Sequence, residues 1–319
     1  MGPPVAAVAS SRLQTVSVGV VVPGEVLASG VAGLSSWVTA VAAAGLDHVA
    51  VGDHVSFRGG RGNDALVVAS VIAGLHPTLP IHTAVVLLAL RHPVVVARQV
   101  ATLTSLAPGR LVLGVGAGGD DPHELEVCGI DPASRGSRLD ECIAILRPLL
   151  DGQSVTFHGR HLTVVDASVL PAPSVPVPLL VGGRSDAAVR RAGRCGDGWL
   201  GIWVSPSRFA EGVSTAASAA ADAGRPAPTR HAMQVWCGLD EDQDLATAWL
   251  TEAMEDFYGV PFERFARWSP AGDPAQVAAA LERYVGAGCN CFNLIPRGPD
   301  VLEAVAAAGE VRRLLNGAC

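Results

Sequence analysis

The stretch QVATLTSLAPGRLVLGVGAG, residues 99–118, contains one complete helix-to-strand step of the pattern that decides the fold. Its first part belongs to a stretch of helical period, 94–106, which the Pro108-Gly109 turn ends. The apolar run 111–115 that follows predicts a buried strand, and it closes in glycines. A buried strand joined to a helix by so short a turn is typical of a parallel sheet covered by helices.

The same alternation of short β-branched runs with Ala-rich helical stretches continues from end to end. Eight strands are predicted, at 16–22, 48–52, 81–87, 111–115, 178–182, 198–204, 231–238 and 291–295. Helices are predicted between and after them, at 35–44, 64–75, 94–106, 135–150, 185–195, 207–223, 244–258, 274–286 and 299–315. Eight consecutive strand–helix units favour a closed (β/α)8 TIM barrel over an open doubly wound sheet.

Two segments depart from this rhythm without ending it. Residues 151–178 predict a small hairpin followed by four prolines, and residues 240–273 combine acidic, aromatic and proline residues. The units on either side continue the same pattern, so we expect one barrel domain, 1–319, with two excursions. Both excursions are candidates for the walls of a pocket.

Composition excludes several classes of function. The 319-residue chain is 49% hydrophobic and 17% charged, which is enough apolar material for a large core. Its formal charge of −7 gives no general attraction to nucleic acid or to an acidic membrane. All 23 basic residues are Arg, so Schiff-base and P-loop lysine chemistry is absent.

Cysteine usage and the amino terminus indicate a reducing compartment. The seven cysteines are odd in number and scattered, as expected of free thiols. Residues 1–22 lack a signal-peptide pattern, and no apolar stretch has the continuity of a membrane span, so we expect a cytoplasmic protein. Cys289 and Cys291 form the one close pair, but no second Cys/His pair of zinc spacing lies nearby, so no metal site is predicted.

Glycines border two of the predicted strands. The run Gly114 to Gly119 fits G-x-G-x-x-G spacing, yet Asp120-Asp121-Pro122 follows where a dinucleotide-binding turn would open a helix, so that interpretation is rejected. What remains is a strand end that a flat ligand approaches, or a purely structural turn. The run 181–186, VGGRSD, predicts a capped helix start that is suited to bind phosphate, or an ordinary turn.

Asp53 and His54 follow the second predicted strand, at the barrel end where chemistry occurs. Histidine suits proton transfer near neutral pH, but a histidine that holds a loop by a hydrogen bond is the alternative. The sequence contains no G-x-S-x-G, H-E-x-x-H or P-loop motif, so hydrolase, zincin and NTPase activities lack support.

Four ordered segments resemble the bacterial luciferase-like family over nearly the whole chain. They are TAVVLLALRHP (83–93), the opening stretch 99–118, RLDE (138–141), and VGGR (181–184) through GDGW (196–199). The resemblance implies a (β/α)8 barrel whose members bind FMN or the deazaflavin coenzyme F420 at the carboxyl mouth. The Asp53-His54 pair resembles the F420-using branch.

The resemblance also implies a set of site residues. Members of the family hold a non-prolyl cis peptide in the third strand, which by motif match falls at Ala84-Val85, against which the ring leans. Carried over, the ring and its phosphate end would meet Asp53, Thr83, Ala84, Val85, Gly116, Ala117, Gly118, Gly182, Gly183 and Arg184. Relatives that act on sugars carry an acid where this chain has Gly119, so the acid here must come from His54, Asp120, Asp121 or the substrate.

The leading hypothesis is an F420-dependent oxidoreductase that transfers a hydride between the deazaflavin and a small organic substrate. His54 is the expected proton partner, with Asp53 beside it as the second catalytic candidate. Candidates for binding the anionic tail of the cofactor are Arg58, Arg61, Arg184 and Arg297. The apolar residues Leu87, Leu88, Trp203, Trp236 and Phe257 suggest a hydrophobic substrate, or simply core.

Two alternatives stay open: a monooxygenase that uses reduced FMN, and a non-catalytic flavin-binding barrel. The expected partners are a small-molecule substrate, a reductase that regenerates the cofactor and, as is frequent in the family, a second copy of the chain in a homodimer.

Overall fold

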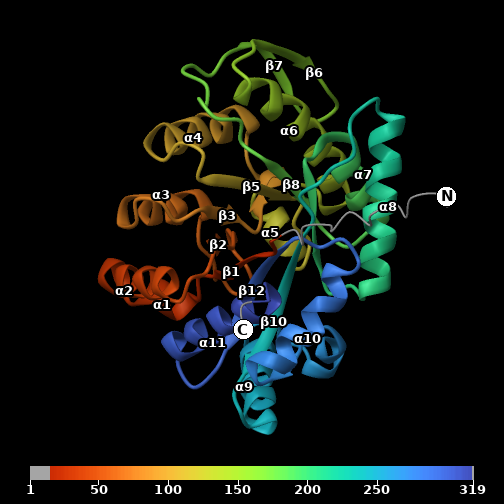
Figure 1. Ribbon diagram of the computed structural model, residues 1–319. Helices are drawn as coiled ribbons and strands as arrows, with labels where there is room; N and C mark the ends of the chain where they lie inside the picture. Colours follow the sequence, from red (N-terminus) through yellow and green to blue (C-terminus); the bar gives the residue numbers. More distant parts are fainter. Residues whose placement is uncertain (1–14, 318–319) are drawn as a thin grey trace, which may run out of the picture.

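A computed structural model describes residues 15–317 as a closed parallel barrel surrounded by helices (Figure 1). Most of the amino-terminal stretch considered for targeting, and Cys319, lie outside the described residues. The eight barrel strands are β1 (Ser17–Val21), β2 (His48–Val51), β3 (Ile81–Thr83), β5 (Leu111–Gly116), β8 (Leu179–Gly182), β9 (Gly198–Ile202), β10 (Ala232–Leu239) and β12 (Cys291–Arg297). The predicted (β/α)8 fold is confirmed, with each of the eight expected strands in place.

Every neighbouring pair around the ring is parallel, and the pairing of β9 with β10 closes the ring. Strand β1 lies between β12 and β2, with Ser17 opposite Cys291 and Gly19 opposite His48. Strand β9 meets β10, with Leu200 opposite Ala232. Since all strands run the same way, their carboxyl ends form one rim and their amino ends form the base.

Most helices that cover the barrel begin and end within two residues of their predicted positions, but the helix predicted at 35–44 begins five residues earlier, at Gly30. They are α2 (Gly30–Ala43), α3 (Ala65–Leu75), α4 (Pro93–Leu106), α6 (Arg135–Leu150), α7 (Asp186–Cys195), α8 (Pro206–Asp222), α10 (Pro274–Val285) and α11 (Val301–Leu315). Cap residues mark many starts: Asp64 accepts from two amides of α3, and Asp273 forms a capping box with Gln276 ahead of α10. Two helices of five residues, α1 (Gly24–Ala28) and α5 (Pro122–Glu126), were not predicted.

The third strand is interrupted as the family resemblance implied. Strand β3 ends at Thr83, the peptide between Ala84 and Val85 is cis, and β4 (Val86–Leu87) resumes pairing with β5. The short 3-10 helix η1 (Leu88–Leu90) then leads into α4. The backbone between β3 and β4 therefore turns toward the rim of the barrel.

The two excursions form different elements. Residues 151–178 contain the expected hairpin, β6 (Val155–His158) and β7 (Thr163–Ala167), which lies at the outer end of α6 (Figure 1). Residues 240–273 contain α9 (Gln243–Tyr258), two 3-10 turns, η3 (Phe262–Arg264) and η4 (Ala266–Trp268), and the short strand β11 (Ala271–Gly272). Within residues 15–317, no helix is both long and apolar enough to cross a bilayer.

The core has two layers, as the period of the strands requires. Outward-facing strand residues such as Val49 and Val51 pack against the helices in one continuous cluster. The alternate position, Ala50, joins Leu180 and Leu200 in a separate small cluster inside the barrel. Alanine and leucine side chains fill this inner layer.

Candidate active site

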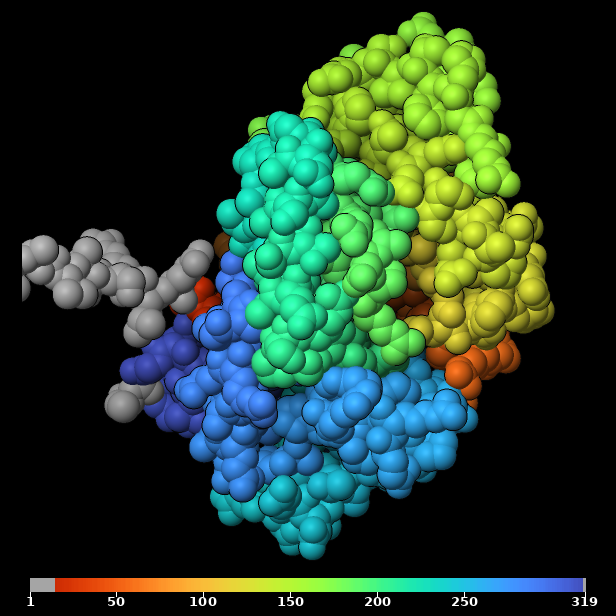
Figure 2. Space-filling model, turned by 90° about the vertical axis from the view of Figure 1, so that its right-hand side faces the viewer, coloured from red at the N-terminus to blue at the C-terminus, as the bar shows by residue number. Residues whose placement is uncertain are grey.

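A cavity of about 1350 Å³ lies at the carboxyl-terminal rim of the barrel. Figure 2 shows the hollow that opens on this face, bordered by segments far apart in the sequence. Residues at or just after the carboxyl ends of five different strands contribute to its lining: Gly52, Ala84, Gly116, Gly182 and Trp203. Convergence of strand ends on one hollow is how barrels of this type build active sites.

Ten of the predicted site residues line this cavity. They are Asp53, His54, Ala84, Val85, Gly116, Ala117, Gly118, Gly182, Gly183 and Arg184. Thr83, predicted together with them, does not line the cavity. Its side chain is buried, and its Oγ1 donates to the Gly114 carbonyl at 2.8 Å. This side chain ties β3 to β5 behind the cavity wall.

Val85 forms one wall, and two glycines make room for it. A Cβ added at Gly116 would lie 2.5 Å from Val85 Cγ2, and one added at Gly182 would lie 2.8 Å from Val85 Cγ1. Contacts that short do not occur between real carbon atoms, so both positions require glycine if Val85 is to stay where it is. The glycines identified from the sequence thus leave the space that Val85 occupies in the segment between β3 and β4.

Asp53 lines the cavity, but its carboxylate is occupied by the protein itself. Oδ2 accepts from the Leu87 amide at 2.7 Å and from Arg91 Nη1 at 2.6 Å, and Oδ1 accepts from the Ala65 amide at 3.0 Å and from Arg91 Nη2 at 2.8 Å. Burial raises the pKa of Asp53, while the Arg91 guanidinium and the two amides oppose that rise. These four bonds connect the second strand to β4 and to the start of α3, which is a positioning role.

His54 turns the other way, toward the cavity. Its side chain is 26% exposed, so it is open to the cavity. The ring stacks on Phe57 with centroids 4.3 Å apart, and Nδ1 lies 3.2 Å from a carboxylate oxygen of Glu124. A carboxylate beside Nδ1 fixes the tautomer and leaves Nε2 to exchange a proton.

Glu124 is the functional residue that sequence analysis missed. It is 2% exposed and also accepts from the amides of Val55 at 2.6 Å and Ser56 at 3.3 Å. Burial favours its protonated form, but the bonds from His54 and these two amides outweigh burial and lower the pKa of the carboxyl. A signal was present: Asp121 caps α5 through the His123 amide, which fixes the turn that carries Glu124.

The two aspartates proposed as acids differ in position. Asp120 lines the cavity. Asp121 caps α5 and accepts from the Arg58 amide at 2.8 Å, and these bonds to Arg58 and His123 lower the pKa of its carboxyl. The rejection of a dinucleotide-binding turn is confirmed, because a loop separates Gly116 from the short helix α5.

Three of the four proposed arginines lie at the cavity. Arg61 pairs with Asp256 and Arg297 pairs with Glu25, at 3.0 and 2.9 Å. Arg184 lies over the Trp203 ring at 5.5 Å and, among residues 15–317, forms no ion pair. It directly precedes α7, whose first turn Ser185 caps, so an unpaired guanidinium and a helix start face the same space. Arg58 lies outside the lining and stacks on Phe57.

The opposite wall is aromatic and comes largely from α9. Leu87, Trp203, Trp236 and Phe257 line the cavity as expected, but Leu88 is fully buried elsewhere in the core. Trp236 Nε1 donates to the Tyr258 hydroxyl at 3.1 Å, which ties α9 to β10. Of the two excursions, only 240–273 forms a pocket wall. The expectation that 151–178 also forms one was wrong. Glu141 of α6 accepts from three backbone amides of the hairpin loop in 151–178 and so holds that loop away from the rim.

Three donors of the cavity-lining side chains have no acceptor within the described part of the chain. They are Trp203 Nε1, Trp249 Nε1 and Arg297 Nε. Buried donors without acceptors are costly unless a ligand or water satisfies them. The cavity therefore combines apolar walls, a glycine floor and unmatched donors, which suits a flat heterocycle with polar edges.

This geometry defines a (β/α)8 barrel with an active-site cavity at its carboxyl rim. The chain belongs to the luciferase-like monooxygenase family, whose model matches residues 16–291. An F420-dependent glucose-6-phosphate dehydrogenase of Kineococcus radiotolerans is 30% identical over 276 residues, which is 76% of this chain and 81% of that protein. An uncharacterized protein of Mycobacterium tuberculosis is 34% identical over 165 residues, so the match spans 52% of this chain and only 57% of that relative.

Solved structures share the fold at lower identity. An F420-dependent secondary alcohol dehydrogenase in complex with an F420-acetone adduct superposes with a TM-score of 0.82 at 23% identity, over 94% of this chain and 99% of that one. Monooxygenase RslO1 from Streptomyces bottropensis superposes with a TM-score of 0.76 at 21% identity, over 92% and 97% of the two chains. Both have the barrel architecture described above.

Proposed function

We propose that this protein is an F420-dependent oxidoreductase acting on a small, hydrophobic organic substrate. Bound F420 would supply hydride chemistry at the central ring of its deazaflavin. The observation that carries the proposal is the His54–Glu124 pair, which opens into a glycine-floored cavity beside Val85. The F420-dependent name of the Kineococcus relative supports the choice of cofactor.

The residues of the cavity fit this group. Val85 offers an apolar face for the ring, and Gly116 to Gly118 leave the ring edge uncovered by side chains. Arg184, just ahead of α7, offers a positive charge to a phosphate beside the helix start, whereas the Gly183 amide already donates to the Leu200 carbonyl at 3.2 Å. The unmatched donors of Trp203 and Arg297 are available to polar atoms of the cofactor or substrate.

His54 moves the proton that accompanies hydride transfer. Glu124 keeps Nδ1 protonated and stabilises the imidazolium, so Nε2 takes a proton from an alcohol or returns one to a carbonyl. Asp53 acts indirectly, because its carboxylate holds the backbone of Leu87 and the loop that carries His54 in position. Asp120 is one of several carboxylates that line the cavity and is a further candidate acid.

The aromatic wall supports the hydrophobic substrate. Trp203, Trp236 and Phe257 offer large apolar faces, and a substrate held there is shielded from water. The sugar-phosphate substrate in the name of the Kineococcus relative is disfavoured here, because Gly119 stands where sugar-acting relatives carry an acid.

Titration of the purified protein with F420 and with FMN, followed by fluorescence, tests the cofactor. We expect F420 to bind and FMN to bind far more weakly. A panel of secondary alcohols and enones then tests turnover, with His54→Ala expected to lower turnover about 10²–10⁴-fold while F420 affinity is kept. Tight FMN binding without F420 binding would overturn the proposal.

A monooxygenase that uses reduced FMN is the second candidate, favoured by the aromatic enclosure of the cavity, since a reactive oxygen adduct must be kept dry. It would need a separate reductase as partner, whereas the F420 enzyme needs a partner only to recycle its cofactor. Cofactor binding without turnover on any substrate would instead favour a non-catalytic flavin-binding barrel. Sedimentation at micromolar concentration tests the proposed homodimer.

A further inference from the structure

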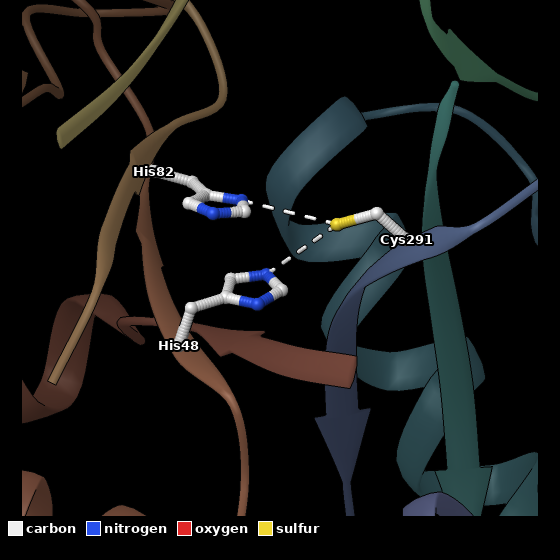
Figure 3. A group of neighbouring side chains, drawn as sticks. All are labelled: His48, His82 and Cys291. Atoms are coloured by element: carbon white, nitrogen blue, oxygen red, sulfur yellow. Dashed lines mark hydrogen bonds between the residues drawn. The ribbon is translucent and has the colours of Figure 1, made fainter. Parts of the chain in front are cut away.

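Two histidines and a cysteine meet inside the base of the barrel, at the end opposite the active site. His48 opens β2, His82 lies on β3 and Cys291 opens β12, so three strands contribute one side chain each (Figure 3). One potential ligand atom from each residue lies within 4.8 Å of the others. We infer that this cluster is a buried metal site that binds one thiophilic d10 cation, Zn²⁺ or Cu⁺.

The three side chains present their ligand atoms toward a shared space. Cys291 Sγ lies 3.9 Å from His82 Nδ1 and 4.0 Å from His48 Nε2. With metal–nitrogen bonds of about 2.0 Å and a metal–sulfur bond of about 2.3 Å, trigonal or tetrahedral coordination needs N···S separations of roughly 3.5–3.8 Å. Closure by a few tenths of an ångström, with a tilt of the two rings, brings all three ligands onto one ion.

The two rings are stacked, so metal binding requires them to turn. His48 and His82 stack with centroids 3.7 Å apart and planes 15° apart. Both rings have one edge toward the sulfur (Figure 3). Because an imidazole nitrogen binds a metal in the plane of its own ring, at least one ring must rotate out of the stack before both can hold one ion.

Neighbouring polar groups supply the outer parts of a metal site. Asn293 Oδ1 lies 2.7 Å from His48 Nε2, close enough to become a fourth, oxygen ligand when that nitrogen binds the ion. Ser17 Oγ lies 3.2 Å from His48 Nδ1 and can accept its proton. A hydrogen bond to the nitrogen that does not bind metal is the usual way a ligating histidine is oriented.

The fold makes room for these groups at a place where barrels normally carry apolar side chains. A Cβ at Gly19 would lie 2.4 Å from the His48 ring, so glycine on β1 is required for that ring to point inward. His48 is 0% and His82 9% exposed.

The ligand set limits the ion. Two neutral imidazoles and one thiolate carry a single negative charge, which Cu⁺ neutralises and Zn²⁺ converts to a single positive charge. Thiolate and imidazole together favour these soft or borderline ions over Mg²⁺ and Ca²⁺, which prefer oxygen. Sequence analysis predicted no metal because Cys289 and Cys291 lack a partner pair of zinc spacing; the partners come from distant strands instead.

Metal-free protein titrated with Co²⁺, as a spectroscopic substitute for Zn²⁺, provides the direct test. We expect one equivalent to bind and to produce a thiolate-to-cobalt charge-transfer band that Zn²⁺ abolishes. Competition with Cu⁺ under anaerobic conditions ranks the two ions. Cys291→Ser and His82→Asn should each remove the band and weaken Zn²⁺ binding by at least about 100-fold.

Cys289→Ser is the matched control, because Cys289 lies two residues from Cys291, is buried, and donates to the Cys291 carbonyl at 3.3 Å. It should bind metal like the unmodified protein, with circular dichroism confirming the fold of every variant. Should Cys291→Ser fail to fold, protection of Cys291 from alkylation by Zn²⁺ in the unmodified chain replaces it. Absence of stoichiometric binding of any of these ions, or loss of the band in Cys289→Ser alone, would overturn the inference.

Discussion

Replacing Asp53 by Asn separates the two neighbouring residues that the sequence presents as one catalytic pair. The change removes the charge that receives two bonds from Arg91, at 2.6 and 2.8 Å, and leaves a guanidinium that is only 16% exposed. Loss of one partner from a buried ion pair costs about 3–5 kcal/mol. Arg91 keeps Asp64 as a partner at 3.2 Å, so the lower end, about 3 kcal/mol, is expected.

The same substitution weakens the bond to the Leu87 amide, which at 2.7 Å joins Asp53 to the segment after Val85. We therefore expect a less stable protein whose cofactor affinity falls with the loosening of that wall. Urea unfolding followed by circular dichroism measures the first effect, and F420 titration measures the second. At roughly 2–4 °C per kcal/mol, the melting temperature should fall by about 6–12 °C.

Asp256→Asn is the control for the loss of a charge. Asp256 pairs with Arg61 at 3.0 Å, but the two side chains are 73% and 54% exposed, and such surface pairs contribute about 0–1 kcal/mol. A stability loss in Asp53→Asn no larger than in Asp256→Asn would refute the positioning role. Unchanged stability with lost turnover would instead make Asp53 a catalytic residue.

Three further predictions test the cavity and the base of the barrel. Glu124→Gln removes the carboxylate that holds His54 Nδ1, so turnover in steady-state assays should fall about 10²–10⁴-fold while F420 affinity is kept. Unaltered turnover would refute a role of the His54–Glu124 pair in proton transfer. Gly182→Ala places a Cβ 2.8 Å from Val85 Cγ1, so the free energy of unfolding should drop by about 1–3 kcal/mol. Fluorescence titration should show that F420 binds at least tenfold more weakly. Normal affinity would mean that Val85 is not a wall of the cofactor site. Burial lowers the pKa of His48 from 6.5 to about 4, so the unfolded chain takes up this proton at a higher pH than the folded chain does. The folded state therefore keeps its full stability above pH 6.5 and loses about 3 kcal/mol as the pH falls to 4. His48→Gln should remove this loss, so stability measured by urea denaturation should vary less between pH 6.5 and 4.

The secondary structure could be predicted closely because local chemistry marks nearly every boundary. Pro and Asp begin α10, Gly ends α9, and β-branched runs bounded by glycine identify the strands. The helices α1 and α5 were missed because five residues are too few to show a helical period. The break between β3 and β4 followed from the family resemblance alone, since the run 81–87 has the composition of an unbroken strand.

The division of roles within the site could not be predicted, because it depends on where side chains point. Successive residues of an extended segment face opposite directions, so Asp53 turns toward Arg91 and His54 toward the cavity. Glu124 reaches His54 across 70 residues, through a turn set by the Asp121 cap. No spacing rule connects those two positions before the barrel closes.

The base cluster and the rim site share strands but have different physical requirements. On β3, His82 lies at the base while Ala84 and Val85 form the cavity wall, only a few residues and about 10 Å along the strand. The apolar cluster of Ala50, Leu180 and Leu200 lies inside the barrel between the two ends. An ion at the base would therefore add to the stability of the barrel, whereas the proton at His54 is controlled by Glu124, and loss of one function should leave the other intact.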